Sequence, residues 1–468
     1  MHNWVPEIGP GRGDTYLLLA DAIEQAIRAG RLKAGARLPT HRDFSRRLGI
    51  AVSTVTRAYA EVSARGLIES TVGRGTFVSA TSDSGGREEP RPLERMYVSF
   101  VPDADVVDLS LNHPLRQGAG AAFGRSLSEM VAEADLDELS LYHPPHGSAD
   151  HRAAGVDWLA FLGVEVEAED TMVVAGGQTA LLSILLTFAR RGDVVLTEQL
   201  TWPGALAIAQ TVGIRLEPVR LDQEGLDPEA FEAACRKFSP RMLYTMPTLH
   251  NPTARTSSTE HRREIARIAS AHNVLIVEDD AYGFLVQPRA VAYWNIAPDI
   301  SLYLTSMSKP VAPAMRIGYL AARAALRRKL RATLRATTVM PSPLLSELSA
   351  RMIRSGEAEE RANFQADAAA RRQRLADRIL GSARPAPTSL HRWLPLPPGM
   401  RTADFVGMAL SRSVAVTPGD VFSVSPEYDP GGVRVCVNAE PDESRFARAL
   451  GVLADILTTD RSGGLPVV

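Results

Sequence analysis

The sequence predicts a two-part protein, a small helical head followed by a larger α/β body. Apolar residues recur at helical spacing in the first 65 residues, and from about residue 105 short apolar runs alternate with helical segments. Residues 79–95 (SATSDSGGREEPRPLER) lack apolar periodicity, which is typical of a solvated linker. We therefore expect a head at 12–80, a linker at 81–104, and a body divided into a large part (105–340) and a small C-terminal part (341–468).

Composition restricts the class of protein. Of 468 residues, 45% are hydrophobic and 23% are charged, which is ordinary for a folded globular chain. The longest apolar stretch, around Ala180–Ala189, is too short to span a membrane. The N-terminus lacks a signal layout, and two cysteines, Cys235 and Cys436, cannot form a disulfide framework. We expect a cytoplasmic protein with no membrane partner and no metal site.

The net charge of -2 is unevenly distributed. Residues 1–80 hold eleven basic and seven acidic residues, so the head carries +4 and the rest of the chain carries -6. A small basic head on a larger acidic body indicates a polyanion as the partner of the head.

The first helix of the head is predicted by apolar residues that repeat every three or four positions. These residues are Leu19, Ile23, Ala26 and Ile27. Thr40, with Asp43 three residues later, is typical of a capping box and predicts a second helix through Leu48. Gly49 then supplies the positive φ of a tight turn.

A third helix follows this turn, and we expect Ser53 to cap it. Its core face is Val55, Tyr59 and Val62, and its other face is Thr54, Thr56 and Arg57. Two short helices joined by a glycine turn predict a helix-turn-helix. Hydroxyls and one arginine near the start of its second helix suit base edges and phosphates in a major groove.

A two-stranded hairpin completes the head. Leu67–Ile68 and Thr76–Val78 flank a Gly-Arg-Gly tip that places Arg74 at the apex, within reach of phosphate or a minor groove. The alternative is a three-helix protein-interaction domain, which the basic charge and the order helix, turn, helix, wing disfavour.

The segment LPTHRDFSRRLGIAVSTVTRAYAEVSARGLIESTVGRGTFV resembles the winged-helix domain of GntR-type bacterial transcription regulators. The resemblance covers essentially all of residues 12–80 and implies that the head binds double-stranded operator DNA. It also implies the DNA contacts, which would be Arg42, Ser53, Thr54, Thr56, Arg57 and Arg74.

The short apolar runs of the body indicate buried strands separated by helices, and this order predicts a mainly parallel sheet. The predicted strands are Thr171–Val174, Val194–Thr197, Met242–Thr245, Val274–Glu278 and Leu302–Thr305. Ligands of such sheets bind at the carboxyl ends of the strands, so the residues that follow each strand are the candidates for a site.

Several chemical groups follow these strands. Gly176, Gly177 and Gln178 begin a helix, where free backbone N–H groups suit a phosphate. An acidic pair at a strand end rarely serves packing, because an unpaired buried charge is costly. The remaining strand-end and loop groups are Trp202, Asn251, Asp279, Tyr282, Ser306, Ser308, Lys309 and Arg316.

One cofactor, pyridoxal 5'-phosphate, uses all of these groups. Its aldehyde needs a lysine amine, and its pyridine nitrogen needs a carboxylate that keeps it protonated. It also needs donors to the ring phenolate, a flat side chain on the ring and a phosphate cup. Taken singly, the glycine pair is more often a simple turn and Trp202 more often a core residue.

Over residues 105–455 the body resembles fold-type I aminotransferases of class I/II, most strongly in TLHNPTARTSS, VEDDAYGFL and LTSMSKPVAPAMRIGYL. The resemblance implies that Lys309 forms the Schiff base, Asp279 pairs with the pyridine nitrogen, and Asn251 and Tyr282 bind the phenolate oxygen. It implies a stacking role for Trp202. The implied phosphate ligands are Gly177, Gln178, Ser306, Ser308, Arg316 and, from the neighbouring subunit, Tyr142.

Arg434, in GVRVCVNAE, would bind a substrate carboxylate through two donors. An isolated arginine on a strand is more often structural, so this role is the least specific of the set. The usual NPTG motif reads Asn-Pro-Thr-Ala here, with Ala254 in place of glycine.

The pairing of head and body resembles the MocR-type regulators, which implies a homodimer. Three hypotheses follow. The first is a transcription regulator that senses pyridoxal phosphate, or an amine or amino acid effector reacting with it. The second is a working aminotransferase acting on an amino acid. The third is a dimerisation scaffold that has lost its cofactor, which the presence of Lys309 and Asp279 disfavours.

Overall fold

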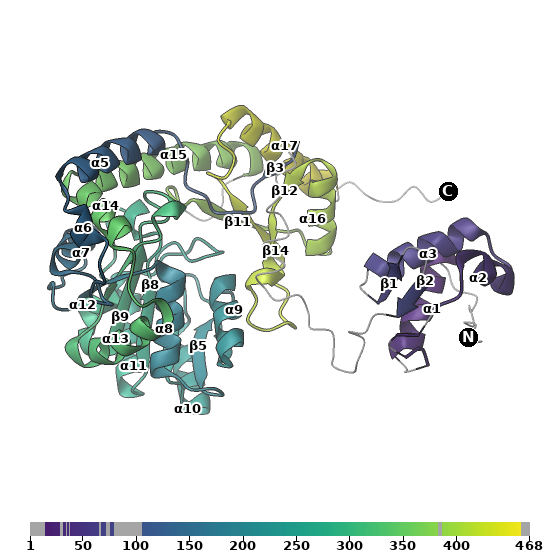
Figure 1. Cartoon of the computed structure of the whole chain (residues 1–468), viewed down its shortest axis with the longest axis horizontal. Coiled ribbons are helices and arrows are strands. Elements are labelled where there is room, and N and C mark those ends of the chain that lie inside the picture. Colours follow the sequence, from purple (N-terminus) through teal and green to yellow (C-terminus); the bar gives the residue numbers. More distant parts are fainter. Residues whose placement is uncertain are drawn as a thin grey trace. The chain divides into compact units, whose positions relative to one another are not determined.

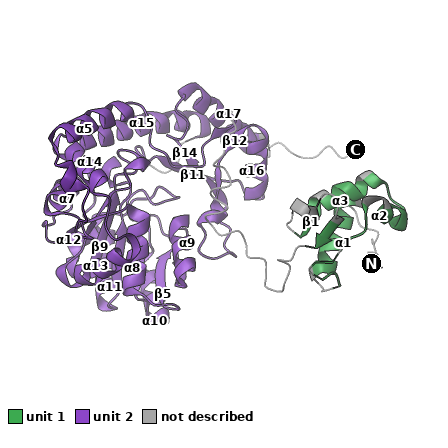
Figure 2. Ribbon diagram, viewed as in Figure 1, with its two compact units in different colours: residues 1–89 green, residues 90–468 purple. Residues whose placement is uncertain are grey.

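The chain divides into two compact units, residues 1–89 and 90–468 (Figure 2). We describe each by itself, from a computed structural model. The residues that the structure describes are 15–28, 31–33, 35–36, 38–64, 67–71, 75–78, 105–381 and 386–459.

The head is three helices and a hairpin (Figure 1). The helices are α1 (Thr15–Arg28), α2 (His41–Leu48) and α3 (Val52–Ala64), and the antiparallel strands are β1 (Ile68–Thr71) and β2 (Gly75–Val78). As predicted, the Thr40 side chain accepts a hydrogen bond from the Asp43 N–H at 3.3 Å, and Gly49 ends α2 with φ 66°. A helix-turn-helix with a hairpin is therefore confirmed.

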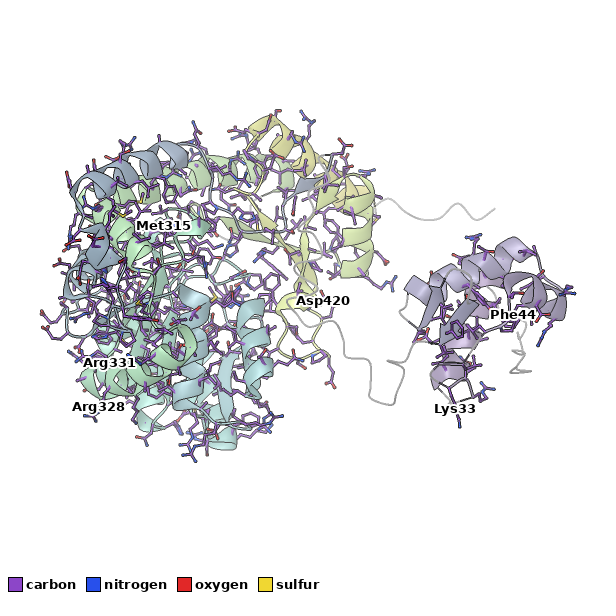
Figure 3. The ribbon with its side chains drawn as sticks, viewed as in Figure 1. Lys33, Phe44, Met315, Arg328, Arg331 and Asp420 are labelled. Carbon is purple, nitrogen blue, oxygen red and sulfur yellow. The ribbon has the colours of Figure 1, made fainter. Side chains whose placement is uncertain are left out.

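The predicted apolar faces of the helices form the core of the head. Val55, Tyr59 and Val62 are buried, as is Phe44, which lies within the head in Figure 3. The prediction that Ser53 caps α3 is wrong by two residues, because the cap position is Ala51. The Ala51 carbonyl already accepts from the N–H of residues 54 and 55, so the helix begins at Val52 and includes Ser53.

The large part of the body is built on a seven-stranded sheet with the order β4-β10-β9-β8-β7-β5-β6. The strands are β4 (Thr171–Val174), β5 (Val194–Glu198), β6 (Arg215–Val219), β7 (Met242–Thr245), β8 (Leu275–Asp279), β9 (Ser301–Ser306) and β10 (Gly318–Ala321). All five predicted strands are present within one residue of the expected limits. The sheet is mainly parallel, and β10 is antiparallel to both of its neighbours.

Helices cover both faces of this sheet, because successive residues of a strand point to opposite faces. In β5, Val195 packs with residues of α8 and α9, whereas Val194 and Leu196 pack with residues of α10 and α11. The helices up to this point are α5 (Ala119–Glu133), α6 (Leu136–Leu139), α7 (Ala149–Phe161), α8 (Gly177–Phe188), α9 (Pro203–Val212), α10 (Pro228–Phe238), α11 (Thr259–Ala271) and α12 (Tyr293–Ile296).

The remaining elements include a second sheet with its own core. The helices are α13 (Ala324–Thr338), α14 (Pro343–Arg354), α15 (Glu357–Leu380), α16 (Thr402–Ser411) and α17 (Glu443–Thr459). The strands are β3 (Val107–Asp108), β11 (His391–Pro395), β12 (Val414–Ala415), β13 (Thr417–Pro418) and β14 (Gly432–Cys436), with β11-β14-β13 in one sheet and β12 paired with β3. Within the described residues there are also four 3-10 turns: η1 (Gly283–Leu285), η2 (Pro298–Ile300), η3 (Pro313–Met315) and η4 (Gly419–Phe422).

Leu109, which directly follows β3, is buried in the core of the second sheet with Phe405, Val435 and Phe446. The first described residues of the body therefore fold with its last ones. Among the helices of the described residues, none is both long and apolar enough to cross a bilayer.

Candidate functional site

Polar groups gather where β8 and β9 end. Asp279 is the last residue of β8, and Ser306 is the last residue of β9. The two strands are parallel neighbours with Asp279 paired to Leu304, so their carboxyl ends meet at one edge of the sheet. Lys309 follows three residues after Ser306, and this edge carries the predicted lysine and carboxylate together.

Lys309 is half-buried and its amine donates a hydrogen bond of 2.6 Å to the main-chain oxygen of Asn112. Burial, together with the charge of Arg434, lowers the pKa of Lys309 to about 8. A larger share of this amine is therefore neutral near pH 7 than for an ordinary lysine, and the neutral amine is the nucleophile.

Asp279 is buried and accepts a hydrogen bond of 2.8 Å from the Tyr244 hydroxyl. Burial raises the pKa of Asp279 to about 6, and the bond from Tyr244 opposes that rise. In the described part of the chain no cation forms an ion pair with Asp279. A buried carboxylate in this setting fits a protonated pyridine nitrogen, which would supply the missing positive charge.

Asn251, Tyr282 and Arg434 are buried. Tyr282 and Lys309 both bond to Asn112, and the charge of Arg434 acts on Lys309. Arg434 Nη1 donates to Asn251 Oδ1 at 2.8 Å, and its guanidinium lies over the Phe422 ring at 4.8 Å. Arg434 therefore lies in the predicted site, and its hydrogen bond to Asn251 holds its side chain in place. The pKa of Tyr282 is raised by burial, which keeps its hydroxyl protonated.

A cup with the groups that a phosphate needs lies at the start of α8. Gly176 caps the helix with φ 83°, and a Cβ there would lie 2.8 Å from Arg316 Nη2. The Ser306 hydroxyl accepts from the Ser308 N–H at 3.1 Å and donates to the Ser308 hydroxyl at 2.9 Å. Arg316 reaches the same Ser308 hydroxyl at 3.5 Å. Gly177 and Gln178 form the first turn of α8, whose N–H groups attract anions.

The turn that carries Arg316 is held firmly. Met315, the residue before it, is fully buried inside the body (Figure 3). Arg316 itself has φ 45° and is exposed, so its side chain is available at the cup.

For the side chains of two predicted residues, Trp202 and Tyr142, the described part of the chain offers no hydrogen-bond partner. Trp202 is half-buried at the start of α9, with its ring against Gly204. Tyr142 is 86% exposed.

Two further residues of the site, Tyr244 and Asn112, were not predicted from the sequence. Tyr244 could have been found, because Tyr244 pairs with Val277 in the register of β7 and β8, and Asp279 lies on the same face two residues further on. Asn112 lies outside the main sheet, in a segment whose position no strand pattern predicts. Its side-chain amide donates to the Tyr282 hydroxyl at 2.9 Å.

In the head, α3 places Thr56 and Arg57 on its exposed face and leaves Thr54 half-buried. The Arg57 guanidinium lies 3.9 Å from the centre of the Tyr16 ring. Arg42 is the second residue of α2, and Ser53 is the second residue of α3. Arg74 lies outside the described residues.

The fold and this site define a class of protein. Residues 104–453 match the family model "Aminotransferase class I and II", and residues 15–78 match "Bacterial regulatory proteins, gntR family". The chain belongs to the aminotransferase class I and II family and carries a gntR-family domain at its head. The predicted pairing of head and body is confirmed.

Two curated relatives align with both the head and the body of this chain over most of their length. The uncharacterized HTH-type transcriptional regulator YdeF of Bacillus subtilis is 29% identical over 97% of both chains. The uncharacterized HTH-type transcriptional regulator YdcR of Escherichia coli is 26% identical over 88% of this chain and 93% of its own. Two solved aminotransferases share the fold of the body. They are the kynurenine aminotransferase of Pyrococcus horikoshii (TM-score 0.72, 22% identity, 83% of this chain and 98% of its own) and LysN, the alpha-aminoadipate aminotransferase of Thermus thermophilus (TM-score 0.70, 22% identity, 82% and 99%).

Proposed function

We propose that this protein is a pyridoxal 5'-phosphate-dependent, DNA-binding transcriptional regulator of the cytoplasm that senses the cofactor or an amino compound. One observation carries the proposal: a gntR-family head shares its chain with a body in which Lys309, Asp279 and a phosphate cup meet at one sheet edge. The two relatives named above are themselves named transcriptional regulators.

The residues of the body would each make one contact with the cofactor. Bound pyridoxal phosphate supplies an aldehyde that captures amines and a ring that accepts electrons. Lys309 would bind the aldehyde carbon, Asp279 would keep a proton on the ring nitrogen, and Asn251 and Tyr282 would donate to the phenolate oxygen. The phosphate ligands would be Gly177, Gln178, Ser306, Ser308 and Arg316, and Trp202 would lie on the ring face.

Arg434 would bind the carboxylate of an amino acid effector. Its guanidinium is buried, lies beside Asn251 and has an Nε atom with no partner in the described residues. A buried guanidinium with an unused donor favours an anionic group as its ligand.

The active form would be a homodimer. The α5–α6 region and the loop after it expose a run of large apolar side chains, which monomers rarely do. They are Leu127, Val131, Leu136, Leu141 and Tyr142. A second copy on this face would bury them and bring Tyr142 to the phosphate of its neighbour. Two heads would then bind repeated or palindromic half-sites of the operator.

In the head, Arg42, Ser53, Thr54, Thr56, Arg57 and Arg74 would contact the DNA. The experiment is selection of a duplex from a random-sequence pool by the full chain loaded with pyridoxal phosphate. We expect a preferred sequence, and visible absorbance from bound cofactor that Lys309→Ala removes. Failure to select any sequence, or cofactor absorbance unchanged in Lys309→Ala, would refute the proposal.

A second candidate function is transamination of an amino acid. The presence of both the lysine and the carboxylate, with an arginine for the substrate carboxylate, favours it. Multiple-turnover assays with a panel of amino acids and keto acids separate the two. Rapid turnover without selection of a DNA sequence would establish the enzyme and reject the regulator.

A further inference from the structure

The first described part of the body enters the ligand site. We name residues Val107–His113 the entry segment. The Val107 and Leu109 N–H groups each donate at 2.8 Å to main-chain oxygens, of Ser413 and Ala415 respectively. Along the chain this segment follows residues 79–104, which connect the head to the body. If the entry segment moves, the point at which residues 79–104 join the body therefore moves with it.

Three groups of the proposed ligand site bind the entry segment. Lys309 Nζ donates to the Asn112 main-chain oxygen at 2.6 Å, and Arg434 Nη2 donates to the Ser110 main-chain oxygen at 2.6 Å. The Tyr282 hydroxyl accepts from Asn112 Nδ2 at 2.9 Å. Thr417 also donates its hydroxyl to the Ser110 oxygen, at 2.7 Å. The segment is thus held by the same side chains that a ligand would engage.

The orientation of the Asn112 side chain is fixed by its neighbours. His391 Nε2 lies 3.1 Å from the His250 main-chain oxygen, and a carbonyl only accepts, so Nε2 carries the hydrogen. His391 Nδ1 is then the acceptor for Asn112 Nδ2 at 3.1 Å. Both amide hydrogens of Asn112 are used, on His391 and Tyr282. The Tyr282 hydroxyl, already an acceptor, keeps its own hydrogen for a ligand.

We propose that the entry segment couples the chemical state of Lys309 to the DNA-binding head, an inference that rests on the function proposed above. When the neutral Lys309 amine condenses with an aldehyde, a C=N bond forms, and one water leaves with the aldehyde oxygen and both amine hydrogens. The imine nitrogen then takes up one proton from solvent and carries a single hydrogen. A trigonal nitrogen with one hydrogen, in place of a tetrahedral ammonium with three, would lose its donation to the Asn112 oxygen. Pyridoxamine phosphate has no aldehyde, so Lys309 remains an ammonium and keeps the bond.

The two cofactor forms therefore differ in a contact to the segment that leads to the head. Such a differential contact is what linkage requires for a ligand to shift DNA affinity. The expected size is a difference of about tenfold in DNA affinity between the two forms, within the usual 5–150-fold range.

The first experiment is hydrogen exchange on the full chain, loaded with pyridoxal phosphate or with pyridoxamine phosphate. We expect exchange at 107–113 to be several-fold faster with pyridoxal phosphate, and exchange in β4 to be equal in both forms. Equal exchange at 107–113, with both cofactors shown to be bound by their absorbance, would overturn the coupling and leave the proposed function intact. Loss of cofactor binding itself would instead refute the proposed function.

The second experiment weakens the hold on the segment without touching Lys309. Thr417→Val removes a hydroxyl that donates to the Ser110 oxygen. Thr171→Val is the matched control, a buried threonine of β4 whose hydroxyl donates to the Glu167 oxygen at 2.9 Å. On the selected duplex, wild type and Thr171→Val should keep the difference of about tenfold, and Thr417→Val should reduce it to within about twofold. A difference retained in Thr417→Val, or absent from wild type, contradicts the proposal.

Discussion

Asp279→Asn should change how the stability of the cofactor-free body depends on pH. Burial raises the pKa of Asp279 to about 6 in the folded chain, against about 3.9 for an ordinary aspartate. The folded state therefore holds this proton more tightly than the unfolded state. The contribution of Asp279 to stability is fully present below pH 4 and is lost as the pH rises through 6.

The magnitude follows from the shift in pKa. About two units at roughly 1.4 kcal/mol per unit give about 3 kcal/mol over the whole window, of which about 2 kcal/mol falls between pH 4.5 and pH 7.5. Asparagine cannot ionise, so the variant lacks this loss. The unfolding free energy of Asp279→Asn minus that of wild type should rise by about 2 kcal/mol between these two pH values.

The assay is urea unfolding followed by tryptophan fluorescence, because four of the five tryptophans lie in the body. They are Trp158, Trp202, Trp294 and Trp393. Asp157→Asn, on the exposed face of α7, controls for the loss of one negative charge. A difference between Asp279→Asn and wild type that stays flat or falls with pH would show that burial does not dominate at this carboxylate.

Other predictions test the cup, the strand contact and the head. Gly176→Ala should weaken pyridoxal phosphate binding at least tenfold in a titration, because the new Cβ would meet Arg316. The control is Gly192→Ala, at a glycine with φ 88° and open space around it. This variant has the same backbone strain without the contact, so it should bind the cofactor normally. Tyr244→Phe removes a bond to a charged group worth about 1.5–3 kcal/mol, so the pH below which cofactor affinity falls should move up by about 1–2 units; an unmoved midpoint contradicts this. Arg57→Ala should lose more affinity for the selected duplex than for a scrambled one, and equal losses would make Arg57 a phosphate contact.

Much of the fold was predictable because buried strands are short apolar runs with polar residues at their ends. Two strands of the seven-stranded sheet were not predicted. β6, Arg215–Val219, lies at the edge of the sheet with a half-exposed, partly charged sequence, and β10, Gly318–Ala321, is a buried run of only four residues. The turn chemistry of the head was equally readable, since Thr40 and Gly49 act locally. The start of α3 was predicted at Ser53 because serine is a common N-cap residue. In the structure the main-chain carbonyl of Ala51 accepts the first helical hydrogen bonds, so α3 begins at Val52.

The candidate site was predictable where its residues follow strands. Asp279 and Ser306 are set by the register of two parallel neighbours, which sequence patterns reveal. Asn112 could not be found in this way. It reaches Lys309 only because the chain after the linker folds back between the large sheet and His391, a long-range packing event that leaves no local pattern.

The site also explains how the free energy of cofactor binding could contribute to a change in DNA affinity. In the cofactor-free body, burial raises the pKa of Asp279 and lowers that of Lys309, so each group is disfavoured in its charged form. A ring cation beside Asp279 and capture of the Lys309 amine would relieve both penalties at once. Because Lys309 also holds the Asn112 carbonyl, part of the free energy gained at the ring is available to move the segment that leads to the head. A ligand that only places a cation beside Asp279 would bind without changing the Lys309 contact to Asn112, and would leave the affinity for DNA unchanged. Pyridoxamine phosphate is such a ligand, so it is the informative comparison.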